Sequence, residues 1–260
     1  MSDPYLYTVT NNVATFSING APWNLMSLEY IDRLEEQLPD VLADDSIRAI
    51  ILTAEGLDHF SAGMDLKQIP EGVKRAGSPE AFFGQRHRVL DMIEQGGTPA
   101  IATLFGYCLG GGLELPLACH FRIAADTRAQ IGLPEMDRGS VPAWGGSARL
   151  PRVVGRNHAL DMILRGRKID GAEAYRIGLV TELVPLADIK ARAQALGEEL
   201  AAQPRQAVKS MLDVIVGFET RTLAESMQDE MNAVVANRGT PDSMEGMRAF
   251  MEKRKPVFNQ

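Results

Sequence analysis

The chain is poor in cysteine and has no excess of positive charge, and both deficits limit its function. Its 260 residues include only two cysteines, without zinc-site spacing and too few for a disulfide framework, which favours a reducing compartment. Basic residues number 27 against 34 acidic ones, so the net charge is −7 and no nucleic-acid partner is expected. With 24 glycines and 14 prolines the chain is neither collagen-like nor dominated by linkers.

Familiar cofactor and metal motifs are also missing. The sequence has no G-x-G-x-x-G, no G-x-x-x-x-G-K-[ST], no H-E-x-x-H and no G-x-S-x-G. Its four histidines are scattered, with no pair four residues apart, so we expect no metal site. These absences disfavour nucleotide-dependent redox chemistry, metal hydrolysis and serine hydrolysis.

One uncharged stretch, Gln95 to Leu113, is long enough to raise the question of a membrane helix. It contains Pro99 and six glycines, which favours a buried strand that leads into a glycine loop. The amino terminus has no basic region followed by an apolar one, so we predict no signal or transit peptide. We therefore expect a soluble, cytoplasmic protein without membrane contact.

Hydrophobic periodicity predicts an α/β protein. Strands that alternate with helices favour parallel pairing. In the first part we expect strands at 6–9, 13–18, 49–52 and 100–105, and helices at 27–42 and 81–93. Later we expect one strand at 180–184 among helices at 159–164, 172–177, 187–202, 207–216 and 222–235. We predict a catalytic body over residues 1–203 and a helical region over 204–260, with two separate domains as the alternative.

Two segments rich in small residues each follow a predicted strand: HFSAGMDL at 59–66 and GYCLGGGLEL at 106–115. Glycine in such a turn lets backbone N–H groups face a ligand without a Cβ atom in the way. Two turns from neighbouring strands could direct two N–H groups at one oxygen, which is the geometry of an oxyanion hole. Either segment alone is better explained as a tight turn.

Together with four later segments, these turns resemble the crotonase (enoyl-CoA hydratase/isomerase) superfamily. The later segments contain IGLPE at 131–135, VPAWGGSARLPR at 141–152, A-x-x-x-G-L-V within 172–184, and A-F-x-x-K-R-K-P-x-F within 245–258. The resemblance implies a spiral of ββα turns with a C-terminal helical region that drives trimerisation, often to a dimer of trimers. It also implies an acyl-CoA substrate, with no cofactor besides the coenzyme A within that substrate.

The resemblance further implies where the substrate binds. The thioester carbonyl would lie between the backbone N–H groups of Ala62 and Gly111. Phe250 and Lys253 would reach the ligand of a neighbouring subunit, or else belong to a solvated basic tail. The other expected substrate contacts are Ser61, Met64, Asp65, Leu66, Lys67, Gly110 and Trp144.

Two glutamates, Glu114 and Glu135, fall where hydratases of this superfamily carry their catalytic pair. Hydration needs a base that activates water and an acid that protonates Cα. The first turn of a helix favours ionised Glu114, and the apolar neighbours of Glu135 favour its protonated form. We therefore expect Glu114 as base and Glu135 as acid. The alternatives are a helix-capping carboxylate for Glu114 and a loop salt bridge for Glu135.

Two features depart from the superfamily pattern. The early loop Asn19–Leu25 lacks the basic R-P-x-x-x-N form, so a coenzyme A contact there is in doubt. Trp144 stands where relatives carry a small residue, and its indole could narrow the acyl pocket, stack on the substrate or face the core. Hydration of a 2-enoyl-CoA is the leading function. The alternatives are isomerisation or hydrolysis of an acyl-CoA and, from another class, a non-catalytic protein that binds coenzyme A or RNA.

Overall fold

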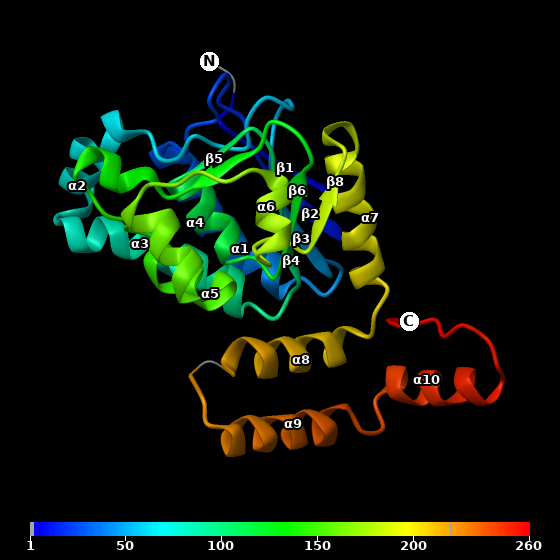
Figure 1. Cartoon of the computed structure of the whole chain (residues 1–260). Coiled ribbons are helices and arrows are strands. Elements are labelled where there is room, and N and C mark those ends of the chain that lie inside the picture. The colour runs from blue at the N-terminus through cyan, green and yellow to red at the C-terminus, as the bar shows by residue number, and fades with distance from the viewer. Residues whose placement is uncertain (1–2, 219) are drawn as a thin grey trace.

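A six-stranded sheet forms the centre of the protein, whose computed structural model describes residues 3–218 and 220–260 (Figure 1). Only the first two strands are antiparallel, and every other neighbouring pair is parallel. The strands in spatial order are β1 (Tyr5–Thr10), β2 (Val13–Ile18), β3 (Ala49–Ala54), β4 (Ala100–Leu104), β6 (Phe121–Ala125) and β8 (Glu182–Val184). A second, small parallel sheet pairs β5 (Tyr107–Leu109) with β7 (Gln130–Gly132).

The described residues form ten α-helices. Three short 3₁₀ turns, η1 (Leu66–Gln68), η2 (Pro134–Arg138) and η3 (Leu186–Asp188), accompany them. The α-helices are α1 (Leu28–Ala43), α2 (Ile69–Ala76), α3 (Pro79–Gln95), α4 (Gly111–Leu117), α5 (Gly146–Leu164), α6 (Gly171–Arg176), α7 (Ile189–Ala201), α8 (Arg205–Gly217), α9 (Leu223–Asn237) and α10 (Pro241–Met251).

Local signals account for several of these boundaries. Asn11 and Asn12 both have positive φ, at 50° and 66°, as a tight turn between two antiparallel strands requires. Ser27 caps α1, because its hydroxyl accepts a hydrogen bond from the Tyr30 N–H. The expected strand at 49–52 and the expected helix at 81–93 are both present, each slightly longer than predicted.

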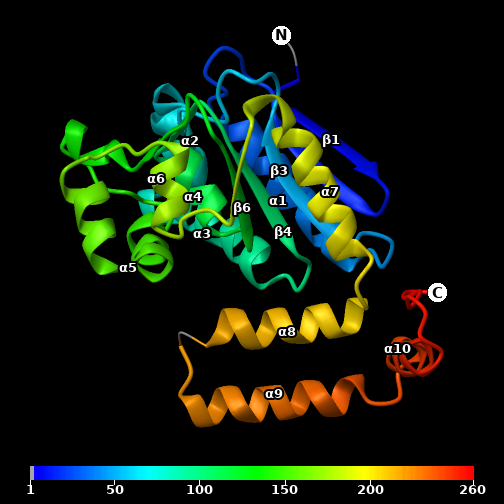
Figure 2. The ribbon, with the colours of Figure 1, turned by 45° about the vertical axis from the view of Figure 1, so that its right-hand side comes forward.

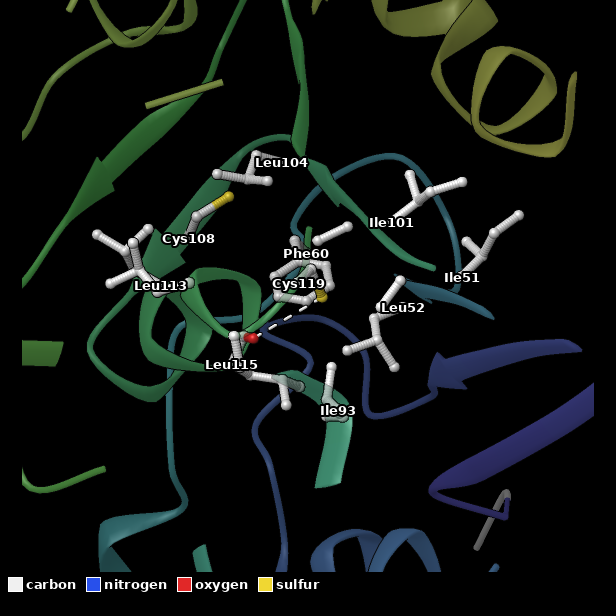
Figure 3. Packing of buried hydrophobic residues seen from close by; sticks show 14 of the residues in the cluster. Ile51, Leu52, Phe60, Ile93, Ile101, Leu104, Cys108, Leu113, Leu115 and Cys119 are labelled. Carbon is white, nitrogen blue, oxygen red and sulfur yellow. Dashed lines mark hydrogen bonds between the residues drawn. The ribbon is translucent and has the colours of Figure 1, made fainter. Parts of the chain in front are cut away.

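The uncharged stretch Gln95 to Leu113 contains a buried strand, β4, as expected. All residues of β3 and β4 are buried, and the core continues from them toward α4 (Figure 3). Leu52, Leu104 and Phe60 pack together with Leu113 and Leu115 of α4 in the same cluster (Figure 3). The glycine-rich turn before α4 is therefore held on a rigid core.

The sequence prediction missed short elements and one helix start. The prediction did not include β5, β6, β7, α2 or α10. Strands of three to five residues and the eight residues of α2 carry too few positions to show a period. Helix α5 begins at Gly146, before the predicted start at 159. Gly155 interrupts it with non-helical φ of 77° and ψ of 158°, which hides the helical period in the sequence.

The last three helices lie away from the sheet. Figures 1 and 2 both show α8, α9 and α10 on one side of the body, with α9 separated from the sheet by α8. Large apolar side chains on them are exposed, including Met227, Met231 and Val235 on α9. The division at residues 203 and 204 stays a prediction. Within 3–218 and 220–260, no helix combines the length and apolarity needed to cross a membrane.

Candidate active site

The two glycine-rich turns lie side by side, as predicted. The Ser61 N–H donates to the Tyr107 carbonyl at 2.9 Å, and the Leu109 N–H donates to the Ser61 carbonyl at 3.1 Å. A Cβ atom at Gly112 would lie 2.3 Å from the Ser61 carbonyl oxygen, so only glycine permits this approach. The sequence thus brings two strand-to-helix turns into direct contact.

One backbone N–H group of these turns, that of Ala62, is not free, contrary to expectation. The Ala62 N–H donates to the Trp23 carbonyl at 2.9 Å, so it is not available to a substrate oxygen in this structure. Within the described residues, the N–H groups of Met64 and Gly111 donate to no protein acceptor. The expectation for Ala62 is therefore corrected, because backbone pairing with the early loop occupies its N–H, and Met64 becomes the candidate donor beside Gly111.

Glu114 lies in the first turn of α4 and is 2% exposed. Its Oε1 accepts hydrogen bonds from the Trp144 N–H at 2.7 Å and the Gly146 N–H at 2.9 Å. Burial nevertheless raises the pKa of Glu114 to about 7. We expected the start of the helix to lower the pKa of Glu114 and favour its ionised form. The pKa is instead raised, because desolvation outweighs the hydrogen bonds from the backbone N–H groups. Since Gly146 begins α5, Glu114 also caps a helix other than its own.

Glu135 lies in η2 and is 8% exposed. Its Oε2 is buried and has no hydrogen-bond partner among the residues described. Burial raises the pKa of Glu135, as expected from its apolar neighbours. No ion pair links Glu135 to any described residue, so the salt-bridge alternative is not observed.

Each carboxyl group lies against a glycine, Glu135 against Gly110 before α4 and Glu114 against Gly146 at the start of α5. A Cβ atom at Gly110 would lie 2.6 Å from Glu135 Oε1, and a Cβ atom at Gly146 would lie 2.8 Å from Glu114 Cγ. The charge of Glu135 contributes to the raised pKa of Glu114, as expected for neighbouring carboxylates. Glu135 therefore lies against the residue that precedes the free Gly111 N–H, and Glu114 is near enough to Glu135 to feel its charge. This combination is suited to acid–base chemistry on a carbonyl compound.

The Trp144 indole is 1% exposed and belongs to the hydrophobic core. Three of its ring atoms lie 3.1 to 3.3 Å from the position of a Cβ atom at Gly111. The guanidinium carbon of Arg86 lies 6.0 Å from the centre of the indole. Among the three alternatives for Trp144, the geometry favours core packing directly against Gly111.

The remaining residues expected to bind substrate have distinct surroundings. The Ser61 hydroxyl is buried and accepts from the Gly63 N–H at 3.0 Å, so it shapes its own turn. Asp65 caps η1 by accepting from the Lys67 N–H at 3.1 Å. Leu66 and Lys67 are exposed, and Met64 is half-buried. The first turn therefore leads from a buried hydroxyl to an exposed rim.

Phe250 and Lys253 are not brought to these residues within one chain. Phe250 is 81% exposed on α10, and Lys253 follows it in an exposed turn. Figures 1 and 2 show α10 well apart from α4. A role in ligand binding therefore requires a neighbouring subunit.

Sequence reasoning missed an aromatic stack beside the first turn. Trp23 stacks on His59 with ring centres 5.3 Å apart, and His59 stacks on Tyr107 at 4.3 Å. The buried Asn24 side chain fixes the early loop by donating to the carbonyls of Glu55 at 3.1 Å and His59 at 2.6 Å. The atypical early loop was the only signal, and it did not reveal that Trp23 would occupy the Ala62 N–H.

The sequence was compared with protein-family models and with known proteins, and the matches point to one family. The enoyl-CoA hydratase/isomerase family model matches residues 8–260. A probable enoyl-CoA hydratase of Bacillus subtilis is 35% identical over 248 residues, covering 95% of each chain. The fatty acid oxidation complex subunit alpha of Shewanella baltica is 35% identical over 205 residues, which are 78% of this chain and 29% of that longer protein.

Solved structures agree with this match. The crystal structure of an enoyl-CoA hydratase from Bacillus anthracis superposes with a TM-score of 0.91 at 33% identity, covering 98% of this chain and 99% of the other. The fold is therefore the crotonase fold that the sequence motifs implied. Because the family model spans nearly the whole chain and the structure agrees over the same length, this protein belongs to the enoyl-CoA hydratase/isomerase family.

Proposed function

We propose that the protein hydrates a 2-enoyl-CoA thioester to a 3-hydroxyacyl-CoA. One observation carries this proposal: two buried and electrostatically coupled carboxyl groups, Glu114 and Glu135, lie near a glycine turn whose Gly111 N–H is free, with Glu135 in contact with Gly110. The reaction needs two proton carriers and a site for negative charge on the thioester oxygen. Two Bacillus relatives, which are named a probable enoyl-CoA hydratase and an enoyl-CoA hydratase, support the same reaction.

In the proposed mechanism, Glu114 takes a proton from water, and the water oxygen forms a bond to C3. The electrons of the C2–C3 double bond move toward the thioester carbonyl, whose oxygen becomes negatively charged. The N–H groups of Gly111 and Met64 stabilise this oxygen. Glu135 then donates its proton to C2, which gives the 3-hydroxyacyl product.

The hydrogen bonds support these roles. Two backbone N–H groups donate to the Glu114 carboxylate, which favours its basic form, while Glu135 Oε2 has no described partner, which favours a protonated carboxyl. A pKa of about 7 gives Glu114 comparable amounts of both protonation states near neutral pH. The assignment of Glu114 as base and Glu135 as acid therefore rests on their hydrogen bonds, since burial raises the pKa of both carboxyl groups.

The proposal includes the substrate, the assembly and the compartment. We propose that the substrate brings the coenzyme A and that no other cofactor takes part. We propose further that three chains, or six, assemble through the C-terminal helices, so that Phe250 and Lys253 reach a neighbour's ligand. With a net charge of −7 we propose no nucleic-acid or membrane partner, and a cytoplasmic location.

The direct test is incubation of the purified protein with crotonyl-CoA. We expect loss of the enoyl-thioester absorbance and formation of 3-hydroxybutyryl-CoA without release of free coenzyme A. Release of the free thiol would instead identify a hydrolase, and 3-enoyl-CoA formation an isomerase. No reaction with crotonyl-CoA or with longer and branched enoyl-CoA thioesters would refute the proposal.

A further inference from the structure

The Trp144–Gly146 turn bonds Glu114 through two N–H groups and bonds Arg149 through a carbonyl. Gly145 has a φ of 98°, which turns the Trp144 and Gly146 N–H groups toward the same Glu114 oxygen. The Trp144 carbonyl accepts a hydrogen bond from Arg149 Nη1 at 3.3 Å. One peptide turn therefore connects the Arg149 guanidinium to the Glu114 carboxylate.

Two acidic residues of α3 hold Arg149 in place. Its Nε donates to Glu94 Oε2 at 2.9 Å, and its Nη2 donates to Asp91 Oδ1 at 2.7 Å. All three guanidinium nitrogens are thus bonded, in a planar arrangement that a lysine ammonium cannot reproduce. The Arg149 side chain is 13% exposed.

Arg149 does not bond Glu114 itself. It lines a groove of about 960 Å³ between α3, α5, α8 and α9, together with Gly145 and Asp91. It bonds the turn through the Trp144 carbonyl, whereas Glu114 bonds the turn through the Trp144 and Gly146 N–H groups. Arg149 therefore reaches Glu114 in two ways: its positive charge lowers the pKa of Glu114, and its hydrogen bond holds the peptide turn.

We propose that Arg149 is a positioning residue for the proposed hydration: it fixes the Trp144–Gly146 turn, and that turn fixes the Glu114 carboxylate. This inference rests on the proposed function. The Arg149 partners are partly exposed, Asp91 by 54% and Glu94 by 29%, and such ion pairs contribute little to the free energy of unfolding. Loss of Arg149 is therefore expected to reduce the rate more than the stability.

The test compares Arg149→Met, Arg149→Lys and Glu94→Gln with the wild-type full chain. Arg149→Met is expected to lower kcat for enoyl-CoA hydration by roughly 10- to 100-fold with little change in KM, because a small displacement of a catalytic group has effects of this size. Arg149→Lys is expected to restore kcat only in part, since one ammonium cannot bond Asp91, Glu94 and the Trp144 carbonyl together. Glu94→Gln keeps Arg149 and should give a smaller loss.

A second measurement does not depend on turnover. In protein labelled with ¹³C at the glutamate carboxyl carbons, with Glu114→Gln used for assignment, the pKa of Glu114 is expected to rise in Arg149→Met. Arg165→Met is the matched control, because Arg165 follows the same helix but pairs only with Asp161, at 2.6 Å. It should change neither kcat nor the Glu114 titration.

The outcomes separate this inference from the proposed function. Wild-type protein that hydrates no enoyl-CoA refutes the function, and the Glu114 titration then still decides the role of Arg149. An unchanged Glu114 titration in folded Arg149→Met overturns the positioning role. A wild-type Glu114 titration in Arg149→Lys overturns it as well, because that variant keeps the charge and loses only the planar set of hydrogen bonds. Full recovery of kcat in Arg149→Lys also overturns it, because charge alone would then suffice.

Discussion

The Glu114 carboxylate accepts a 2.7 Å hydrogen bond from the backbone N–H of Trp144, thirty residues later in the chain. The same Trp144 places its indole behind Gly111, whose N–H is free. One residue thus contacts both the proposed base and the glycine of the proposed oxyanion hole. This arrangement places the proton carrier and the charge-stabilising donor on one packed unit.

Glu114→Gln and Glu135→Gln are each expected to reduce kcat strongly while the fold is retained. Each substitution removes one proton carrier and keeps the side-chain shape, a loss that typically amounts to about 10²- to 10⁴-fold. Steady-state kinetics on the preferred enoyl-CoA measures the effect. Asp137→Asn is the control, because Asp137 is exposed in η2 and pairs with Lys168 at 3.5 Å. Near-full activity of either glutamine variant would contradict the two-carboxylate mechanism.

Stability should depend on pH through Glu114. Its pKa is raised from an unfolded value near 4.5 to about 7, so its favourable contribution is present below pH 4.5 and is lost as the pH rises through 7. The shift corresponds to a loss of about 3 kcal/mol across this window. Urea unfolding at several pH values should show this loss in the wild type and a flatter dependence in Glu114→Gln. Parallel curves for the two proteins would show that Glu114 titrates normally.

Gly111→Ala is expected to impair catalysis through the oxyanion hole. The added Cβ atom would lie 3.1 Å from the Trp144 ring, so the turn must shift and the Gly111 N–H with it. Loss of one such donor typically costs roughly 10²- to 10³-fold in kcat. Gly84→Ala in α3 is the control, since its Cβ atom would meet nothing closer than 3.9 Å. Equal kcat values for the two alanine variants would argue against this oxyanion hole.

Trp144→Ala tests whether the indole limits the acyl group. Removing a buried tryptophan should destabilise the protein by about 3–5 kcal/mol and leave a cavity beside Gly111. We expect the variant to shift kcat/KM toward longer acyl chains, by roughly 1–3 kcal/mol of discrimination for each methylene accommodated. A series of enoyl-CoA thioesters from short to long chains measures this shift. An unchanged profile would leave core packing as the only role of the indole.

The C-terminal helices should mediate assembly. Exposed apolar side chains on α9 include Met227, Met231 and Val235, at 56% to 67% exposure, and their burial between chains would be favourable. We expect a native mass of three or six times 28.4 kDa by light scattering. Met231→Glu should weaken the assembly, whereas Glu230→Gln on the same helix should not. A stable and active wild-type monomer would remove the proposed role of Phe250 and Lys253 in a neighbour's site.

The sequence by itself determined the family, the main strands and the two glutamates. These features depend on local patterns, such as glycines at strand ends, apolar runs at 49–52 and 100–105, and motifs of fixed spacing. The contact between the two glycine turns was also predictable, because parallel neighbouring strands end at the same edge of a sheet.

Only the tertiary structure decided which groups are available for chemistry. The N–H of Ala62 is occupied by the carbonyl of Trp23, a residue that lies far from it in sequence, so we propose Met64 as the donor instead. Burial reversed the expected pKa direction of Glu114, because desolvation sums contributions from every surrounding segment. Arg149 belongs to a sequence motif, but the motif does not show that Arg149 bonds the turn that holds Glu114. Nor does it show that two residues of α3 hold Arg149 in place. Hydrogen-bond competition and desolvation depend on distant parts of the chain, so no local pattern could reveal them.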